Sequence, residues 1–172
     1  MKYTFSPGSI SHDDQIYSVT KISPHVFRHL EKTRSIDFSQ DSKIQSFDEF
    51  TFADSSIERL SIPPLVSHLG HGWCRGTPNL RQIKLSPNNS NFMYLDDKML
   101  IGKKDDKSDI CDVLVFVRRD IEEVVIPSFI DVIGPYAFSN SKLEEIVIPP
   151  KVTRICECAF YSCKNLKKVT IS

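Results

Sequence analysis

The sequence has no excess of either charge, few glycines and no long apolar run. Its 22 basic and 22 acidic residues cancel, so the chain lacks the positive field that attracts nucleic acids and anionic membranes. We therefore expect no nucleic-acid partner. Its six glycines do not recur at loop spacing, which excludes a phosphate-cradling glycine loop. The best apolar run, residues 113–117, is far shorter than the roughly 18 residues of a membrane span, so we expect no direct membrane insertion.

The cysteines and the first residues of the chain bear on its location. An odd number of cysteines with no framework spacing favours free thiols, and hence a reducing compartment. Residues 1–15 contain no uninterrupted apolar run of the kind that a secretory signal requires. Both features indicate a cytoplasmic location. The five cysteines are Cys74, Cys111, Cys156, Cys158 and Cys163.

What the sequence does contain is a repeat with a period of 22 to 24 residues. Residues 124–145 read VVIPSFIDVIGPYAFSNSKLEE, and residues 146–168 read IVIPPKVTRICECAFYSCKNLKK. Looser copies lie upstream. A repeat of this length has too little apolar surface to fold alone, so the copies must stack and align their short strands in one parallel sheet. The second apolar strand residue of each copy, stepping by 24, 23, 41, 22 and 23, is Phe38, Ile62, Leu85, Ile126, Ile148 and Ile171.

Proline and phenylalanine mark fixed places in each copy. Pro127 and Pro149 follow the strands and should end them, because proline has no N–H for the ladder. Phe138 and Phe160 recur at one place in the return segment, so we expect their rings to be buried in a common spine. Replacing either ring with alanine should cost about 3 to 5 kcal/mol.

The pattern IPxxVxxIGxxAFxxCxxLxxIxI, present from Ile148 to Ile171 with Cys156 in place of the glycine, resembles the BspA-like leucine-rich repeat family. The resemblance covers most of the chain, although Trp73 and Cys74 stand at the Ala-Phe place of their copy. It implies a right-handed curved solenoid. It also implies a location on the surface of bacteria or microbial eukaryotes, with adhesion to matrix or host proteins as the function.

These observations predict an α/β-type repeat solenoid that forms a single leucine-rich repeat domain over residues 1–172. A short parallel β-sheet should line the concave face, and the return segments should be irregular or short helices. The 41-residue step predicts an inserted hairpin-like segment, which should lie on one face of the array. The predicted parts are a degenerate N-terminal repeat (1–35), repeats (36–85), the insertion (86–121) and well-formed repeats (122–172).

The candidate binding residues are the outward residues of the strands, because solenoids use their concave surface for binding. Their charges are mixed along the stack, in the order acidic, basic, basic, acidic, acidic, basic, which favours a protein or glycoprotein partner over a polyanion. The alternative interpretation is that these residues only keep the surface soluble. The residues are Ser35, Asp37, Arg59, Ser61, Gln82, Lys84, Glu123, Val125, Glu145, Val147, Lys168 and Thr170.

Several groups of residues resemble metal sites, but the repeat alignment, the number of ligands or their spacing argues against each. His68, His71 and Cys74 have a spacing that zinc could use, yet the alignment places the histidines outside and the cysteine inside. Cys156 and Cys158 fall on different faces, and neither converges on Cys163. His25 and His29 lack a further ligand. The aspartates of the insertion do not follow a calcium-loop spacing; they are Asp96, Asp97, Asp105, Asp106 and Asp109.

The sequence also carries no nucleophile elbow and no catalytic cysteine signature. We therefore expect no catalytic residue, no cofactor and no resident metal. The first hypothesis is a non-catalytic binding module that mediates adhesion at the cell surface; the alternative is an intracellular scaffold for protein–protein interaction. Because the last strand, residues 169–172, leaves an open edge, we also expect self-association that sedimentation would detect as a dependence on concentration.

Overall fold

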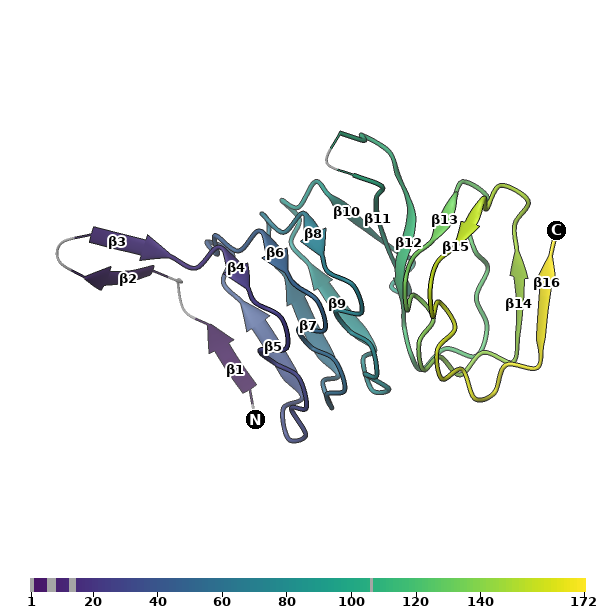
Figure 1. Cartoon of the computed structure of the whole chain (residues 1–172), viewed down its shortest axis with the longest axis horizontal. Helices are drawn as coiled ribbons and strands as arrows, with labels where there is room; N and C mark the ends of the chain where they lie inside the picture. Colours follow the sequence, from purple (N-terminus) through teal and green to yellow (C-terminus); the bar gives the residue numbers. More distant parts are fainter. Residues whose placement is uncertain (1, 6–8, 13–14, 106) are drawn as a thin grey trace.

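The chain folds as a β-solenoid in which most turns carry one strand of four residues and one of two residues (Figure 1). The computed structural model describes residues 2–5, 9–12, 15–105 and 107–172. The longer strands form a parallel first sheet that is divided into two blocks. One block has the order β1 (Lys2–Phe5), β5 (Ser35–Phe38), β7 (Arg59–Ile62) and β9 (Gln82–Leu85), and the other pairs β14 (Glu145–Ile148) with β16 (Lys168–Ile171).

The shorter strands form a second parallel sheet, which is divided at the same level of the solenoid. Most of these strands follow a first-sheet strand of the same turn along the chain. In the N-terminal half the order is β4 (Lys21–Ile22), β6 (Ser46–Phe47) and β8 (His68–Leu69). In the C-terminal half, β13 (Val132–Ile133) and β15 (Arg154–Ile155) continue it.

Hairpins are inserted at the same place in two turns, between the first-sheet strand and the second sheet. The first hairpin consists of β2 (Ser9–His12) and β3 (Gln15–Ser18). The second consists of β10 (Phe92–Leu95) and β11 (Met99–Lys103), followed by β12 (Cys111–Val117). The predicted insertion therefore contains an antiparallel hairpin, and β12, the strand that follows it, pairs with both β11 and β13 and so belongs to the solenoid.

The second hairpin separates two hydrophobic cores. Side chains of alternate residues in β11 point to opposite faces, so Leu100 packs into the core of the N-terminal half, whereas Met99 and Ile101 pack into that of the C-terminal half. In β12, a register shift opposite Leu100 and Ile101 interrupts the alternation, so Phe116 belongs to the first core and Leu114 to the second. The inserted strands thus lie between the two halves of the solenoid and contribute side chains to both cores (Figure 1).

The predicted α/β class and the short helical return segments are wrong, since the described residues form strands and turns but no helix. Phe50 and Asp54 both have φ of 52°, and Tyr136 and Asn140 have φ of 56° and 62°. An α-helix needs φ near −63° at every residue, so two left-handed residues four apart prevent one from forming. The same pair of places is left-handed at His25 and His29, Gly72 and Gly76, and Cys158 and Ser162.

The predicted aromatic spine is present. The Phe27 and Phe52 rings stack at 5.6 Å between centroids, and the Phe138 and Phe160 rings stack at 4.9 Å with 11° between their planes. Phe138 is fully buried. Phe160 is only half-buried, because no described turn covers the face of its ring that points away from Phe138.

The spine phenylalanine is missing from two successive turns. Cys74 stands at its place in the third turn. In the next turn Val117 occupies the equivalent position. Its N–H donates to Ala137 O at 3.0 Å, and the Phe138 N–H makes the corresponding bond to Ala159 O at 2.8 Å. Both replacements are smaller than phenylalanine, so they leave space at the junction of the two halves.

Arg119 fills that space and is fully buried. Its guanidinium carbon lies 4.6 Å from the centre of the Phe116 ring, and its Nη1 donates to Ala137 O at 2.8 Å. Nη2 lies 3.4 Å from Cys74 Sγ, and the backbone N–H of Arg119 donates to Leu80 O at 3.2 Å. Burial lowers the pKa of Arg119 and raises the pKa of Cys74. Arg119 therefore joins the two halves through main-chain and side-chain contacts.

Candidate functional site

The outward residues of the first sheet lie on its two blocks and on residues 122–126 between them, and we call this surface the long-strand face; its residues are those predicted for the concave face. On the N-terminal block, Arg59, Gln82 and Lys84 are exposed. On the C-terminal half, the backbone of successive turns presents Glu123 with Val125, Glu145 with Val147, and Lys168 with Thr170, all of them exposed. The structure thus places nine of the candidate residues where a partner could reach them.

Ser61 and Asp37 depart from the prediction. Ser61 is only 6% exposed, because its Oγ accepts a hydrogen bond from the Phe38 N–H at 2.7 Å and so replaces a main-chain acceptor in the ladder. Asp37 is half-buried and accepts a hydrogen bond from Ser35 Oγ at 3.1 Å, and Ser35 itself is buried. These side chains stabilise the N-terminal block and are not available as an exposed contact surface.

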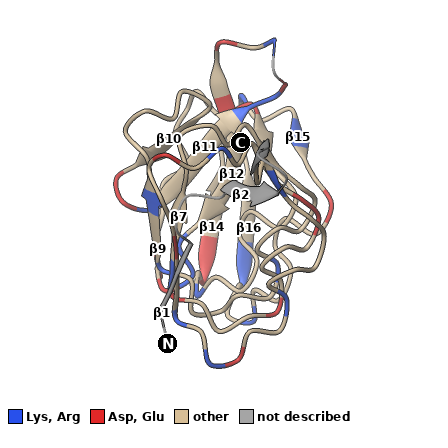
Figure 2. Cartoon of the chain, turned by 90° about the vertical axis from the view of Figure 1, so that its left-hand side faces the viewer, with Lys and Arg blue, Asp and Glu red and all other residues tan. Residues whose placement is uncertain are grey.

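Charges on the C-terminal half pair between successive turns. Lys168 Nζ lies 3.8 Å from Glu145 Oε2, and Lys167 Nζ lies 2.9 Å from Glu144 Oε2. Figure 2 shows the acidic start of β14 beside the basic start of β16. All four side chains are largely exposed, where an ion pair contributes at most about 1 kcal/mol. These charges are therefore available to orient a partner.

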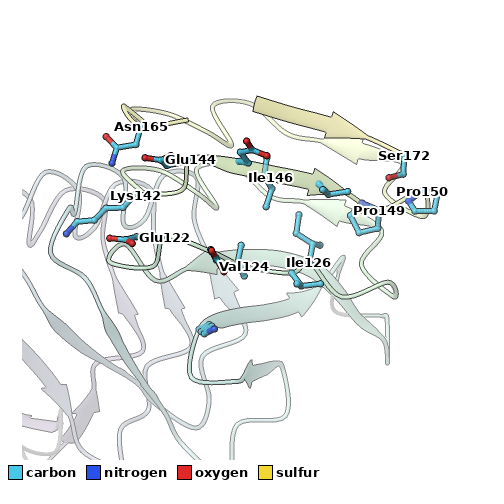
Figure 3. Close-up of a pocket in the computed structure, with 15 residues that line it drawn as sticks. Glu122, Val124, Ile126, Lys142, Glu144, Ile146, Pro149, Pro150, Asn165 and Ser172 are labelled. Atoms are coloured by element: carbon cyan, nitrogen blue, oxygen red, sulfur yellow. The ribbon is translucent and has the colours of Figure 1, made fainter. Parts of the chain in front are cut away.

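A groove of about 1090 Å³ crosses this part of the face, between residues 122–126 and β14 (Figure 3). Val125 and Val147 line it and are 84% and 57% exposed. Glu122, Glu144 and Lys142 lie together at one end, and the two prolines that follow β14 lie at the other. The site is thus an open, elongated channel with apolar walls and a mainly acidic end.

The predicted strand at residues 124–126 is not formed, and this is why the groove exists. In two other turns the residue after the strand closes the ladder: the Ser86 N–H donates to Ile62 O at 3.0 Å, and the Ser172 N–H to Ile148 O at 3.1 Å. At the equivalent place Pro149 has no N–H to donate. The groove was not predicted from the sequence, although this proline marks it.

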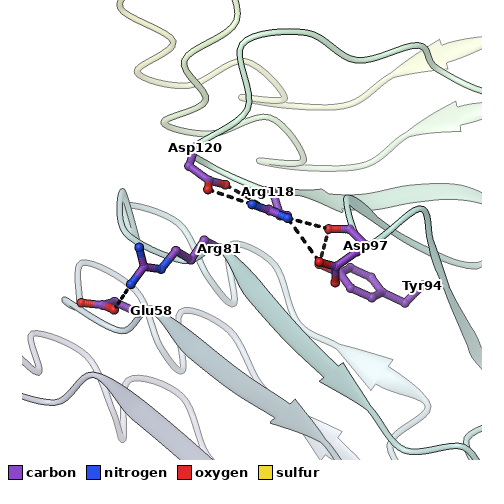
Figure 4. Close-up of polar contacts among 6 residues, drawn as sticks. All are labelled: Glu58, Arg81, Tyr94, Asp97, Arg118 and Asp120. Carbon is purple, nitrogen blue, oxygen red and sulfur yellow. Dashed lines mark hydrogen bonds and ion pairs between the residues drawn. The ribbon is translucent and has the colours of Figure 1, made fainter.

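Polar contacts of Arg118 and Tyr94 hold the turn of the inserted hairpin in place (Figure 4). Arg118 donates to both carboxylate oxygens of Asp120, at 3.0 and 2.8 Å, and to the Asp97 carbonyl at 3.2 Å. The Tyr94 hydroxyl donates to the same carbonyl at 3.2 Å, and burial raises the pKa of Tyr94 to about 12. This network fixes the turn that carries Lys98, which lines the groove.

The candidate metal ligands do not converge. Among the residues that the structure describes, no three His, Cys, Asp or Glu side chains are placed to hold a metal ion. Cys74 is buried against Arg119, whereas His68 is exposed. Cys163 donates from Sγ to Phe138 O at 3.0 Å, while Cys158 is exposed. Asp106 lies outside the described residues.

The described residues also contain no helix that could cross a membrane.

Three comparisons place this geometry among known proteins. A family model described as BspA type leucine rich repeat region matches residues 2–100 and 112–172 in six copies. No curated protein matches the chain. A leucine-rich cell surface protein of Faecalibacterium prausnitzii superimposes with a TM-score of 0.79 at 19% identity, over 99% of this chain and 41% of its own.

Two further solved structures share the fold. A leucine-rich repeat protein of Eubacterium ventriosum has a TM-score of 0.60 at 19% identity, over 88% of this chain and 57% of its own. The pneumococcal vaccine antigen PcpA has a TM-score of 0.56 at 16% identity, over 98% of this chain and 60% of its own. This chain therefore spans 41% to 60% of the length of these three proteins.

Proposed function

Because the chain belongs to the BspA-type leucine-rich repeat family, we propose that it is a non-catalytic module that binds a protein or glycoprotein through its long-strand face. Solenoid repeat proteins use extended sheet surfaces of this kind for binding. The observation that carries the proposal is the pair of exposed valines, Val125 and Val147, in the groove of successive turns. Apolar side chains that are adjacent, exposed and flanked by charges are typical of an interaction surface.

We further propose that this binding serves adhesion at a cell surface. One protein with the same fold is a leucine-rich cell surface protein, and another is a vaccine antigen. The mixed charges of the face favour a protein partner, since complementary charges orient a partner and select among partners.

The first experiment measures binding to immobilised fibronectin, laminin, collagen and mucin. We expect saturable binding to at least one of them, and a loss of tenfold or more in the double variant Val125→Asp, Val147→Asp, because truncating or charging a buried apolar contact costs more than about 1.4 kcal/mol. Val26→Asp is the matched control, because Val26 is 53% exposed and lies outside the long-strand face. Equal binding by the double variant would contradict a role for this face, and no binding by the wild type would contradict adhesion.

An intracellular scaffold is the second candidate, favoured by the five free cysteines. Protease treatment of intact source cells separates the two locations. Adhesion at the surface predicts that the protein is cleaved while a cytosolic marker survives. Survival of both would support the scaffold and direct the search for partners to the cell lysate.

A further inference from the structure

Residues 122–126 occupy the first-sheet place of their turn but make no backbone hydrogen bond with any described residue. In the neighbouring turns the equivalent bonds exist: the Gln82 N–H donates to Glu58 O at 3.1 Å, and the Lys168 N–H to Glu144 O at 3.3 Å. Because Glu122, Glu123 and Val125 are exposed, backbone N–H and C=O groups of this segment are accessible to the main chain of a partner.

The neighbouring strand β14 is also unpaired on the side that faces the groove. Among the strands of the described residues it pairs with β16 alone, over four residues. Glu144 O and Ile148 O accept hydrogen bonds from the β16 side. Because successive residues of a strand direct their N–H and C=O groups to opposite sides, those of Glu145 and Val147 point into the groove. The groove therefore has a strand edge on one wall and an unpaired extended segment on the other.

Proline explains why the chain does not close this gap itself. Pro149 lacks the N–H that would bond to residue 126, and Pro127 lacks the one that would bond toward β9. Pro63 has the same effect on a smaller scale, since β5 and β7 pair over two residues whereas β7 and β9 pair over four. Residues 122–126 thus have a proline at the closing position of both flanking ladders.

The side chains around the groove define what would fit. Four glutamates and two lysines line it, and none of the ion pairs among described residues involves Glu122 or Glu123. On its other edge, β14 already binds a strand with the sequence KVTI, through Lys168–Glu145 and the preceding Lys167–Glu144. A strand with the same pattern and register would place its cations beside the glutamates, its alternating apolar residues on the same side of the sheet as Ile146 and Ile148, and its remaining outward residue beside Val147.

We propose that the groove between residues 122–126 and β14 receives an extended segment of a partner protein as an added β-strand, and that the segment carries basic residues followed by alternating apolar residues. The main chain of β14 supplies the hydrogen bonds and the glutamates select the basic residues, which is the logic of peptide recognition by strand addition. This inference rests on the proposed function and names the partner of the same face.

The probe is a fluorescently labelled synthetic peptide with the sequence of residues 165–172, NLKKVTIS, titrated with the whole chain in an anisotropy assay. We expect saturable binding. A peptide that is N-methylated at alternate residues keeps the side chains but cannot form the ladder, so its binding should be lost. A peptide with glutamates in place of its two lysines should bind at least about tenfold more weakly, because it would place anions beside the groove's glutamates.

Variants of the protein locate the bound peptide. Val147→Pro removes an N–H that points into the groove and spares the β14–β16 ladder, so binding should weaken about tenfold. Val147→Ala keeps the N–H and should bind nearly as the wild type does. Ile171→Pro blocks the outer edge of β16 and should have no effect. Circular dichroism checks that each variant is folded, and slower amide exchange at Glu145 and Val147 on binding would show the ladder directly.

Three results would overturn strand addition: no binding by the wild type, equal binding of the N-methylated peptide, or a loss caused by Ile171→Pro in place of Val147→Pro. The peptide assay requires no natural partner, so its failure removes strand addition alone. Failure of the immobilised-protein assay removes the proposed function.

Discussion

Replacing Phe138 with alanine should lower the free energy of unfolding by about 3 to 5 kcal/mol, because the ring is fully buried and its loss leaves a cavity that the stacked turns cannot close. The ring stacks on Phe160 at 4.9 Å. Phe160 is only half-buried, so Phe160→Ala should cost roughly half as much, in proportion to the area removed from water.

Urea unfolding followed by circular dichroism measures both variants. Phe129→Ala is the matched control, because it removes the same side chain from a position that is exposed in the same turn, and we expect less than about 1 kcal/mol from it. A loss below about 1 kcal/mol for Phe138→Ala would contradict the spine. An equal loss for Phe138 and Phe160 would contradict the graded burial.

Replacing Arg119 separates volume from charge at the junction of the two halves. Arg119→Ala should cost about 3 to 5 kcal/mol, since it empties the space left by two missing phenylalanines. Arg119→Met should change stability by less than about 1.5 kcal/mol, because methionine fills a similar volume and removes the cost of burying a cation that has no carboxylate partner in the described structure.

Thermal and urea unfolding of the two Arg119 variants provide the test. In either variant the Val117 N–H still donates to Ala137 O, at 3.0 Å, so this carbonyl is not left without a hydrogen-bond donor. If Arg119→Met is as unstable as Arg119→Ala, the hydrogen bonds of the guanidinium stabilise the junction, and the volume of the side chain does not.

The repeat period predicts much of this architecture. Strand places at residues 36–38, 60–62, 83–85, 146–148 and 169–171 follow from alternating apolar residues, and the structure has strands at each of them. The family resemblance is confirmed. The helical return segments were wrong because the sequence shows apolar spacing but not φ, and left-handed residues such as Phe50 and Tyr136 are not of a type that announces a positive φ.

The candidate site was predicted in part. Alternation alone places Glu145 and Val147 outward, and the structure agrees on their exposure. Alternation cannot show that Ser61 turns its hydroxyl to the Phe38 N–H, since that bond depends on how two turns align. Whether these residues bind a partner, and whether the β16 edge associates with another copy, remain predictions.

The sequence by itself determined the solenoid, its repeat length, the insertion and the spine, because each depends on a pattern of apolar residues along one chain. Only the tertiary structure decided that the inserted hairpin divides the core, that Arg119 fills the junction and that residues 122–126 stay unpaired. These features depend on contacts between turns that are far apart in sequence, where one proline or one missing ring changes which backbone groups can meet.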